Sequence, residues 1–354
     1  MTDVNVLAVG EPDSAVASHI VEAARNAWAD DETDYTPNGG IPSLRTAIVG
    51  KLQRDNRIDV QMDQVWVTIG ATQALYQAMG LVLDAGDEII IPDPGYTTFT
   101  MNARMLEAVP VPYSLLPSNG FMPDFEEWAR LVTPRTRAVI VNSPSNPLGH
   151  VFGEEVLRGI LRFAREHDLW VISDEVYEYF TYGKDHVSIA SLDEDERVLS
   201  VFSLSKTYAM TGVRVGYLVV PRSMVPTMST VQEAMVSCVS TPGQHAALAA
   251  ITGPQDAVSV ARSHYRENGA AAAQLLDERG IRYLTPDGAF YLWVDLSFAS
   301  QGDVAAWAER FLLEQRVAVA PGSAFGASGE GWIRVCLAVD RARLLDGLAR
   351  LPEP

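Results

Sequence analysis

Short apolar runs alternate with longer stretches of helical periodicity from about residue 65 to residue 220. This alternation is typical of a mostly parallel sheet covered by helices, because a parallel strand has to be reached by a crossover connection. We predict strands at residues 65–69, 88–91, 109–113, 138–142, 170–173, 198–202 and 215–220. We predict helices between them at residues 72–83, 97–106, 125–131 and 154–167. The expected fold class is therefore α/β, with a three-layer large domain built on a seven-stranded, mostly parallel sheet.

The pattern changes after Pro254. A long alanine-rich helical stretch runs to about residue 279, a hairpin-like run follows at 288–295, and mixed short elements continue to the end. A chain of 354 residues also exceeds the usual size of a single hydrophobic core. We therefore expect a second, smaller α+β domain.

Charge and composition argue against several kinds of partner. The formal net charge of -18 repels nucleic acids and anionic membranes, and no apolar run reaches the roughly 18 residues that span a bilayer. Cys238 and Cys336 lie in apolar surroundings without metal-ligand spacing, which predicts inert thiols and no metal site. The first residues lack the basic start and apolar run of a targeting segment. We expect a cytoplasmic protein that acts on small molecules.

The segment 203–217 places Lys206 beside two hydroxyl residues and eight positions before Arg214. A lysine amine can react with an aldehyde, while the hydroxyls of Ser203 and Ser205 and the forked guanidinium of Arg214 supply donors that suit a phosphate. A covalent cofactor site is one interpretation of this segment. A solvated loop lysine is the other.

Two further segments follow predicted strands. Gly70, Ala71 and Thr72 precede a predicted helix, where backbone amides and the Thr72 hydroxyl can bind an anion. The alternative is a simple N-cap by Thr72. The run 92–96 ends in Tyr96, whose ring could stack on a flat heteroaromatic ligand at a strand's carboxyl end or pack against the core.

Three polar residues lie next to or within apolar runs. Asp174 ends a buried strand and needs a cation, which a protonated pyridine nitrogen would supply, unless Asp174 caps the next helix. Arg334 needs an anion, either a substrate carboxylate or an internal salt-bridge partner. Asn146 lies in the run 142–149, which by itself could be only a proline-rich turn.

Taken in order, these segments resemble the motifs of the aspartate aminotransferase superfamily, the class I and II aminotransferases of fold type I. The lysine segment is similar to the pattern Ser-x-Ser-Lys followed by Gly-x-Arg-x-Gly. The run 142–149 is similar to Asn-Pro-x-Asn-Pro-Thr-Gly, with Leu148 in place of threonine. The other matching segments are 10–13 (Gly-Glu-Pro-Asp), 35–45, 94–96 and 321–325 followed by Arg334. The resemblance covers essentially the whole chain.

The resemblance implies that the chain binds pyridoxal 5'-phosphate (PLP). It implies catalytic roles for Lys206, which would hold PLP covalently, for Asp174 at the pyridine nitrogen and for Tyr96 on the ring face. It implies that Asn146 and Tyr177 donate to the phenolic oxygen. The groups implied at the phosphate are Gly70, Ala71, Thr72, Ser203, Ser205, Arg214 and the partner subunit's Tyr35. The residues implied at the substrate are Arg334, which would clamp the α-carboxylate, Asn146 and Gly10.

The resemblance also implies a homodimer with shared active sites. The large PLP-binding domain would comprise residues 26–250, and the small domain residues 1–25 and 251–354. Family members generally carry a longer segment before the Gly-Glu-Pro motif than the nine residues before Gly10. We therefore expect a more open substrate entrance.

The implied reaction is ping-pong transfer of an amino group between an L-amino acid and a 2-oxo acid. The same residues would serve a β- or γ-eliminating lyase, a cyclising synthase or an oxidase, because all begin by removing the Cα proton. A non-catalytic sensor would need an attached helix-turn-helix, for which the residues before Gly10 leave no room. The segment 237–244 has no basic residue where some relatives place an arginine for dicarboxylic substrates. We therefore favour a substrate with a neutral or aromatic side chain.

Overall fold

The central sheet has seven strands in the computed structural model, which describes residues 4–354. The strands are β2 (Val65–Thr68), β3 (Glu88–Asp93), β4 (Val109–Ser114), β5 (Thr136–Asn142), β6 (Trp170–Asp174), β7 (Val198–Ser203) and β8 (Gly216–Val219). Their order is β2-β8-β7-β6-β5-β3-β4, and β8 alone runs antiparallel to its neighbours. The prediction of a seven-stranded, mostly parallel sheet is confirmed.

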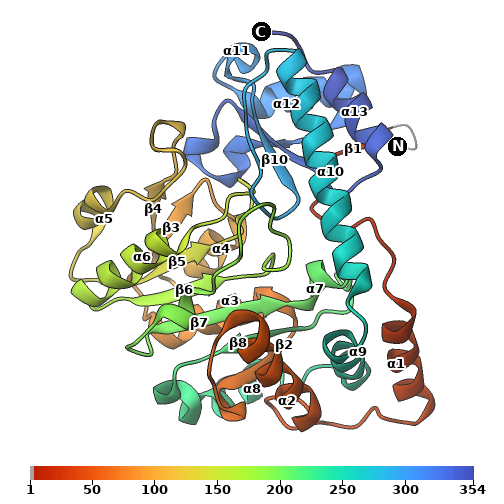
Figure 1. Cartoon of the computed structure of the whole chain (residues 1–354). Helices are drawn as coiled ribbons and strands as arrows, with labels where there is room; N and C mark the ends of the chain where they lie inside the picture. Colours follow the sequence, from red (N-terminus) through yellow and green to blue (C-terminus); the bar gives the residue numbers. More distant parts are fainter. Residues whose placement is uncertain (1–3) are drawn as a thin grey trace.

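Helices cover both faces of this sheet, which is why its central strands are apolar throughout (Figure 1). One face packs against α3 (Gly70–Val82) and α4 (Thr97–Met105), through side chains such as Leu75 and Phe99. The other face packs against α5 (Phe125–Leu131) and α6 (Glu154–Glu166), through Trp128 and Ile160. The result is the three-layer arrangement expected from the alternating pattern.

A third core cluster lies at the β2–β8 end of the sheet. It is formed with α1 (Ser18–Ala29), α2 (Pro42–Lys51) and α9 (Thr241–Thr252). A π-helical turn (Leu52–Asn56) continues α2, and the short α7 (Leu204–Thr207) follows β7 directly. α8 (Val225–Met235) lies near the same end, and short 3-10 turns occur at Met62–Gln64, Pro117–Asn119, Ile189–Leu192 and Arg222–Met224.

A second, smaller sheet lies above the large one in Figure 1. Its order is β12 (Ala320–Pro321), β13 (Trp332–Cys336), β10 (Tyr291–Asp295) and β9 (Tyr283–Leu284), all antiparallel. The predicted hairpin at 288–295 is wrong in detail, because this run holds only β10 and its hairpin partner β9 precedes it. β1 (Asn5–Val6) pairs in parallel with β11 (Val317–Ala318).

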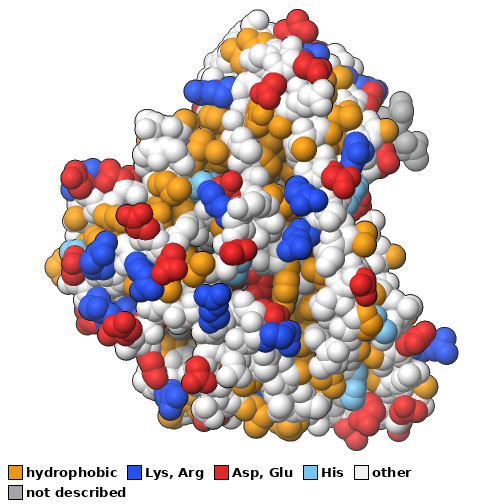
Figure 2. Space-filling view, viewed as in Figure 1, with side chains coloured by type: hydrophobic (Ala, Val, Ile, Leu, Met, Phe, Trp, Pro, Cys, Tyr) orange, Lys and Arg blue, Asp and Glu red, His pale blue; other side chains and the backbone are white. Residues whose placement is uncertain are grey.

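The helices of this upper part are α10 (Asp256–Glu278), α11 (Ser297–Ser300), α12 (Val304–Gln315) and α13 (Arg341–Ala349), with 3-10 turns at Gly322–Phe325 and Ala327–Gly329. None of the helices within residues 4–354 is both long and apolar enough to cross a membrane. Figure 2 shows lysine and arginine side chains interspersed with aspartate and glutamate over the viewed face. The net negative charge therefore does not form a single acidic patch on that face.

Candidate active site

A cavity of about 320 Å³ lies where the carboxyl ends of the central strands meet the smaller sheet. Its size falls in the range of small-molecule sites in proteins. The predicted site residues that line it are Gly10, Ala71, Thr72, Tyr96, Asn146, Asp174, Tyr177, Ser203, Ser205, Lys206, Arg214 and Arg334. The lining also includes Leu75, Val176, Thr211 and Tyr291, which the sequence analysis did not identify.

Neighbouring strand ends bring the polar residues together. Asn142 and Asp174 are opposite each other in the register of β5 and β6. The Asn142 side chain donates to the Asp174 carbonyl (3.1 Å) and accepts from the Asn146 amide (2.8 Å). The run 142–149 is therefore more than a proline-rich turn, because it is tied across the strand ends with Asn146 at the cavity.

Asp174 is 3% exposed, and its carboxylate accepts a hydrogen bond from the Val176 amide at 3.3 Å. Burial raises the pKa of Asp174 to about 7, against the lowering effect of that hydrogen bond. The residues after Asp174 form a turn and no helix, so the helix-cap interpretation is wrong. Within the described chain no cation pairs with this carboxyl group, which suits it to a protonated nitrogen of a ligand.

Lys206 lies on α7, one turn after the end of β7, and its amine faces the cavity. Nζ donates a hydrogen bond to the carbonyl of Gly10 at 2.6 Å. Burial lowers the pKa of Lys206. The Ser203 hydroxyl caps α7 by accepting from the Ser205 amide at 3.1 Å. The solvated-loop interpretation of Lys206 is therefore wrong.

The N-terminus of α3 and Arg214 form a compact anion-binding corner. α3 begins at Gly70 and its N-cap is Ile69, so Thr72 lies inside the first turn and the N-cap interpretation of Thr72 is wrong. Gly70 has φ 68°, and a Cβ there would lie 2.5 Å from Nη2 of Arg214. Glycine suits this positive φ, and its lack of a side chain leaves room for the guanidinium close to the unpaired amides of the helix N-terminus.

Arg334 lies on β13 and is 8% exposed. Its Nη1 donates to Oδ1 of Asn146 at 2.7 Å, and its Nη2 donates to the carbonyl of Ala8 at 2.6 Å. Its buried Nε has no hydrogen-bond partner among residues 4–354, and no carboxylate there pairs with it. The internal salt-bridge interpretation is therefore wrong. The guanidinium lines the cavity without a carboxylate partner.

Tyr177 and Tyr291 form a hydroxyl pair at the cavity wall. Their oxygens are 2.7 Å apart, and the side chains are 3% and 1% exposed. Tyr291 lies on β10 and was missed, because a single tyrosine in an apolar strand looks like a core residue. Tyr96 also contacts the core, with its ring edge-on to Phe99 (5.6 Å between centroids), so its two interpretations are compatible. Tyr35 is 90% exposed and does not line the cavity.

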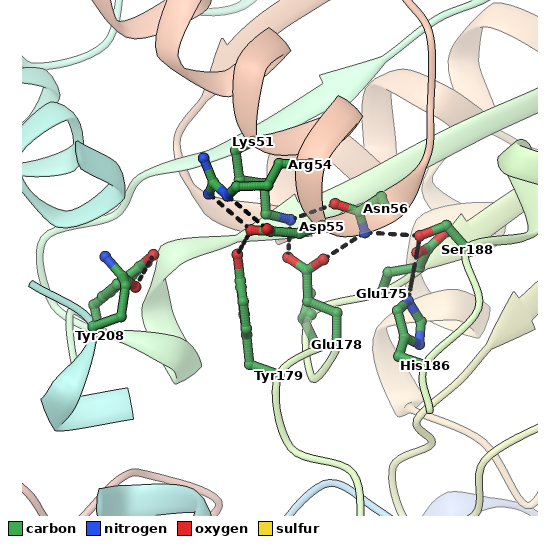
Figure 3. A network of polar contacts seen from close by, with 12 residues as sticks. Lys51, Arg54, Asp55, Asn56, Glu175, Glu178, Tyr179, His186, Ser188 and Tyr208 are labelled. Atoms are coloured by element: carbon green, nitrogen blue, oxygen red, sulfur yellow. Dashed lines mark hydrogen bonds and ion pairs between the residues drawn. The ribbon is translucent and has the colours of Figure 1, made fainter. Parts of the chain in front are cut away.

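A buried polar network includes Glu175 and Glu178, which flank Tyr177 in the turn after β6 (Figure 3). Glu175 accepts hydrogen bonds from Ser173 (2.9 Å), Ser188 (2.5 Å) and His186 (2.8 Å). Strand geometry turns Ser173 to the side opposite Asp174, and Glu175, which bonds to Ser173, does not line the cavity.

Glu178 extends the same network toward α2 (Figure 3). Its carboxylate accepts from Lys51 (2.5 Å) and Asn56 (2.6 Å), and Asn56 also donates to Ser188 (2.7 Å). All of these side chains are buried. The network connects α2 and its π-helical extension to the turn that follows β6.

The sequence matches the family model of class I and II aminotransferases over residues 2–351. It is 38% identical over 351 residues to the aspartate/prephenate aminotransferase of Thermus thermophilus, which covers 98% of this chain and 90% of that protein. The fold is similar to that of an aromatic aminotransferase from Pyrococcus horikoshii (TM-score 0.95, 37% identity, 99% of this chain and 95% of that one).

The fold is also similar to that of Thermus thermophilus aspartate aminotransferase solved with maleate, with TM-score 0.93 and 38% identity over 98% of this chain and 91% of that one. These likenesses confirm the resemblance to fold type I aminotransferases. The chain belongs to the class I and II aminotransferase family, and it is a transferase that moves an amino group between an amino acid and an oxo acid.

Proposed function

We propose that this cavity binds PLP on Lys206 and that the enzyme transaminates L-amino acids with neutral or aromatic side chains. The observation that carries the proposal is the number of cations in the cavity lining: Lys206, Arg214 and Arg334. One is needed for covalent attachment, one for a phosphate and one for an α-carboxylate. None is left in this subunit's lining for a second substrate carboxylate.

The residues fit PLP, the cofactor that members of this family use. The phosphate would lie at the N-terminus of α3 beside Arg214, where Gly70 leaves space for both. The pyridine nitrogen would face Asp174, whose buried carboxyl group has no cation of its own within the described residues. The remaining donors proposed for the phosphate are the amide of Ala71 and the hydroxyls of Thr72, Ser203 and Ser205.

When bound, PLP supplies an electrophilic carbon for the amino group and a ring that withdraws electrons from Cα. The protein must hold the substrate and move the Cα proton. Lys206 Nζ would accept this proton, because burial lowers the pKa of the amine and favours its neutral form. Arg334 would bind the α-carboxylate with Asn146 beside it, since Nη1 already donates to that side chain.

On the cofactor side, Asn146 and Tyr177 would donate to the phenolic oxygen, and Tyr96 would lie on the ring face. Gly10 would border the substrate, because its carbonyl already holds the Lys206 amine. We propose the same catalytic and binding roles for these residues as the resemblance implied.

The preference for a neutral or aromatic side chain is supported by the lining that remains. Leu75, Val176, Tyr96 and Tyr291 offer apolar and aromatic surface. Similar proteins are named for both kinds of substrate: aspartate and prephenate in Thermus thermophilus, and aromatic substrates in Pyrococcus horikoshii. The charge of this cavity favours the second kind.

We also propose a cytoplasmic homodimer in which Tyr35 completes the partner's phosphate site. The 90% exposure of Tyr35 supports this role, because a tyrosine so exposed can reach a neighbouring subunit. The division into a large domain (26–250) and a small domain (1–25 and 251–354) remains part of the proposal.

The test is an amino-donor panel read by absorbance. Phenylalanine, tyrosine, leucine, alanine and aspartate are added singly to the PLP-bound protein, and conversion of the cofactor to its pyridoxamine form is followed. We expect conversion with neutral or aromatic donors and restoration by an added 2-oxo acid. Preferential conversion by aspartate would contradict the substrate proposal, and ammonia release without an oxo acid would indicate a lyase.

Attachment is tested separately. Reduction with sodium borohydride should leave the pyridoxyl group on the peptide that contains Lys206, as read by mass spectrometry. Modification of a different lysine would contradict the cofactor proposal whatever the substrate is.

A further inference from the structure

We propose that Tyr291 is a positioning residue of the transamination site: its hydroxyl directs the hydroxyl of Tyr177, and its ring supports Arg334. This inference rests on the proposed function, because it takes Tyr177 as the donor to the phenolic oxygen of PLP and Arg334 as the carboxylate-binding residue. Tyr291 would thereby connect the two halves of the site.

The hydroxyls of Tyr177 and Tyr291 carry one proton each, but only one of these protons can lie in the hydrogen bond between them. Tyr177 and Tyr291 are 2.7 Å apart at their oxygens, and each hydroxyl finds its only side-chain partner in the other among residues 4–354. One phenol must donate, which leaves the O–H of the other free for the cavity. If Tyr291 donates, the free O–H belongs to Tyr177.

Nearby charges favour donation by Tyr291. Burial raises the pKa of both phenols, and the charge of Arg334, whose Cζ lies 4.4 Å from the centroid of the Tyr291 ring, opposes this rise. Asp174 adds to the rise at Tyr177. The distance alone allows either hydroxyl to donate, and we assign the donor role to Tyr291 because the Arg334 guanidinium lies against its ring and a nearby positive charge makes a phenol a better donor. The O–H of Tyr177 then points into the cavity.

Close packing keeps the Tyr291 hydroxyl in this position. A Cβ on Gly10 would lie 2.2 Å from the Tyr291 oxygen, so the backbone of the N-terminal segment closes one side. The Tyr177 ring lies edge-on at 5.6 Å between centroids and closes another. β10 fixes the backbone, since Tyr291 pairs with Cys336 of β13. The hydroxyl therefore has little freedom to turn away from Tyr177.

The ring of Tyr291 has a second contact. The Cζ atom of Arg334 lies 4.4 Å from its centroid and 4.8 Å from that of Phe325, so two aromatic rings hold the guanidinium. This contact does not involve the hydroxyl. Removing the hydroxyl and removing the ring should therefore have different consequences.

The test uses variants that separate these two parts. Tyr291→Phe removes the hydroxyl alone, and Tyr291→Leu removes the ring as well. Tyr177→Phe and the double variant Tyr177→Phe/Tyr291→Phe complete a mutant cycle. Tyr265→Phe is the matched control, because its hydroxyl is buried but lies outside the cavity.

The first measurement is a spectrophotometric pH titration of bound PLP without substrate. Tyr291→Phe should raise the midpoint by about one pH unit, the size expected for weakening one hydrogen bond to the phenolic oxygen. Tyr177→Phe should raise it at least as much. Tyr291→Phe should add nothing once Tyr177 is phenylalanine, and Tyr265→Phe should leave the midpoint unchanged.

The second measurement is the dissociation constant of 3-phenylpropionate, a carboxylate that has no amino group and cannot react. Tyr291→Phe should leave it within about twofold, whereas Tyr291→Leu should raise it about tenfold through the lost contact with Arg334. Equal effects of the two variants on this constant would overturn the role of the ring.

The outcomes separate this proposal from the proposed function. The role of the Tyr291 hydroxyl is overturned if Tyr177→Phe shifts the midpoint and Tyr291→Phe does not, or if the shifts of the two variants add in the double variant. Either result leaves the proposed function intact. If Tyr177→Phe has no effect, the role proposed for Tyr177 is wrong and the Tyr291 proposal falls with it. A wild-type protein that binds no PLP would overturn the proposed function itself.

Discussion

At the scale of single residues, the site depends on glycines that leave space as well as on polar side chains that fill it. Gly70 gives Arg214 access to the first turn of α3, and Gly10 gives Tyr291 access to the backbone near Lys206. At both positions a methyl group would occupy space that a functional side chain already fills. The charged residues, by contrast, depend on partners that they lack within residues 4–354: Asp174 has no cation and Arg334 no anion.

The first prediction concerns Gly70→Ala. The new Cβ would meet Nη2 of Arg214 at 2.5 Å, on a backbone with φ 68° that alanine adopts at a cost of roughly 1–2 kcal/mol. We expect PLP affinity to fall by at least about tenfold, which equilibrium titration of the cofactor-free protein measures. Gly80→Ala is the control, because its Cβ would meet only Leu106 at 3.7 Å. It should stabilise α3 by about 0.5–1 kcal/mol. Equal PLP affinity in the two variants would contradict the role of Gly70.

The second prediction concerns the pH dependence of Asp174. Burial raises its folded-state pKa to about 7, above the usual value of about 4, so the folded cofactor-free protein binds more protons between these pH values than the unfolded chain. Its stability should therefore fall as pH rises from about 4 to about 7. Asp174→Asn removes this dependence, so urea denaturation should show the variant gaining stability relative to wild type as pH rises. Asp185→Asn, at an exposed position, is the control. A difference that does not change with pH would contradict the buried-acid interpretation.

At the scale of elements, β6 and the turn after it serve two sides of the sheet. Asp174 faces the cavity, while Ser173 and Glu175 face the buried network of Figure 3. The network reaches α2 through Glu178 and Lys51. The turn that carries Tyr177 is therefore stabilised by hydrogen bonds of Glu175 and Glu178, which do not line the cavity.

The third prediction tests that support. Lys51→Met leaves the Glu178 carboxylate buried without its cation, and breaking a buried ion pair in this way costs about 3–5 kcal/mol. The double variant Lys51→Met/Glu178→Met should recover most of this loss. Urea denaturation of the cofactor-free proteins measures both. The exposed pair Glu154 and Arg158 is the control, since Arg158→Met should cost under about 1 kcal/mol. A double variant no more stable than Lys51→Met would mean that the pair acts through packing.

At the scale of the whole molecule, the cavity belongs to two sheets. Arg334 and Tyr291 come from the smaller sheet, whereas Asp174 ends β6 and Lys206 follows β7 in the larger one. Backbone hydrogen bonds also join the two parts beside the cavity, from Gly95 to the carbonyl of Phe325 at 2.9 Å. The relative position of the sheets therefore decides whether the carboxylate-binding and proton-transferring residues meet.

The fourth prediction concerns the proposed dimer. Lys206→Ala has an intact Tyr35, and Tyr35→Ala has an intact Lys206, so a mixed dimer would contain one complete site. Subunits mixed and refolded at equal amounts should regain about a quarter of wild-type activity, because about half of the dimers are mixed and each has one working site of two. Wild-type protein refolded with Lys206→Ala is the control. No gain above the separate variants, or a monomer by light scattering, would contradict the shared site.

Much of the large sheet could be predicted from the sequence, because each strand is marked by the hydrophobicity of a few consecutive residues. An apolar run such as 138–142 must be covered on both faces, and this requirement sets its neighbours and helices. Asp174 and Arg334 could be identified as candidate site residues for a related reason, because each is a charged residue at the end of or within an apolar run and needs a partner. Lys206 was identified by its hydroxyl neighbours and Arg214, and all three line the cavity, while their chemical roles stay predictions.

Only the tertiary structure decided which interpretations of the polar residues were correct. Thr72 lies within the first turn of α3, and Asp174 is followed by a turn, so neither is a cap. Tyr291 could be identified as a site residue only from the structure, in which β10 pairs with β13 and the Tyr291 hydroxyl contacts that of Tyr177. Its hydroxyl contacts Tyr177 across 114 positions of the chain, and no local pattern records that contact. The sequence by itself therefore determined the sheet and the reactive groups, and the packing of one sheet on the other determined how those groups are positioned.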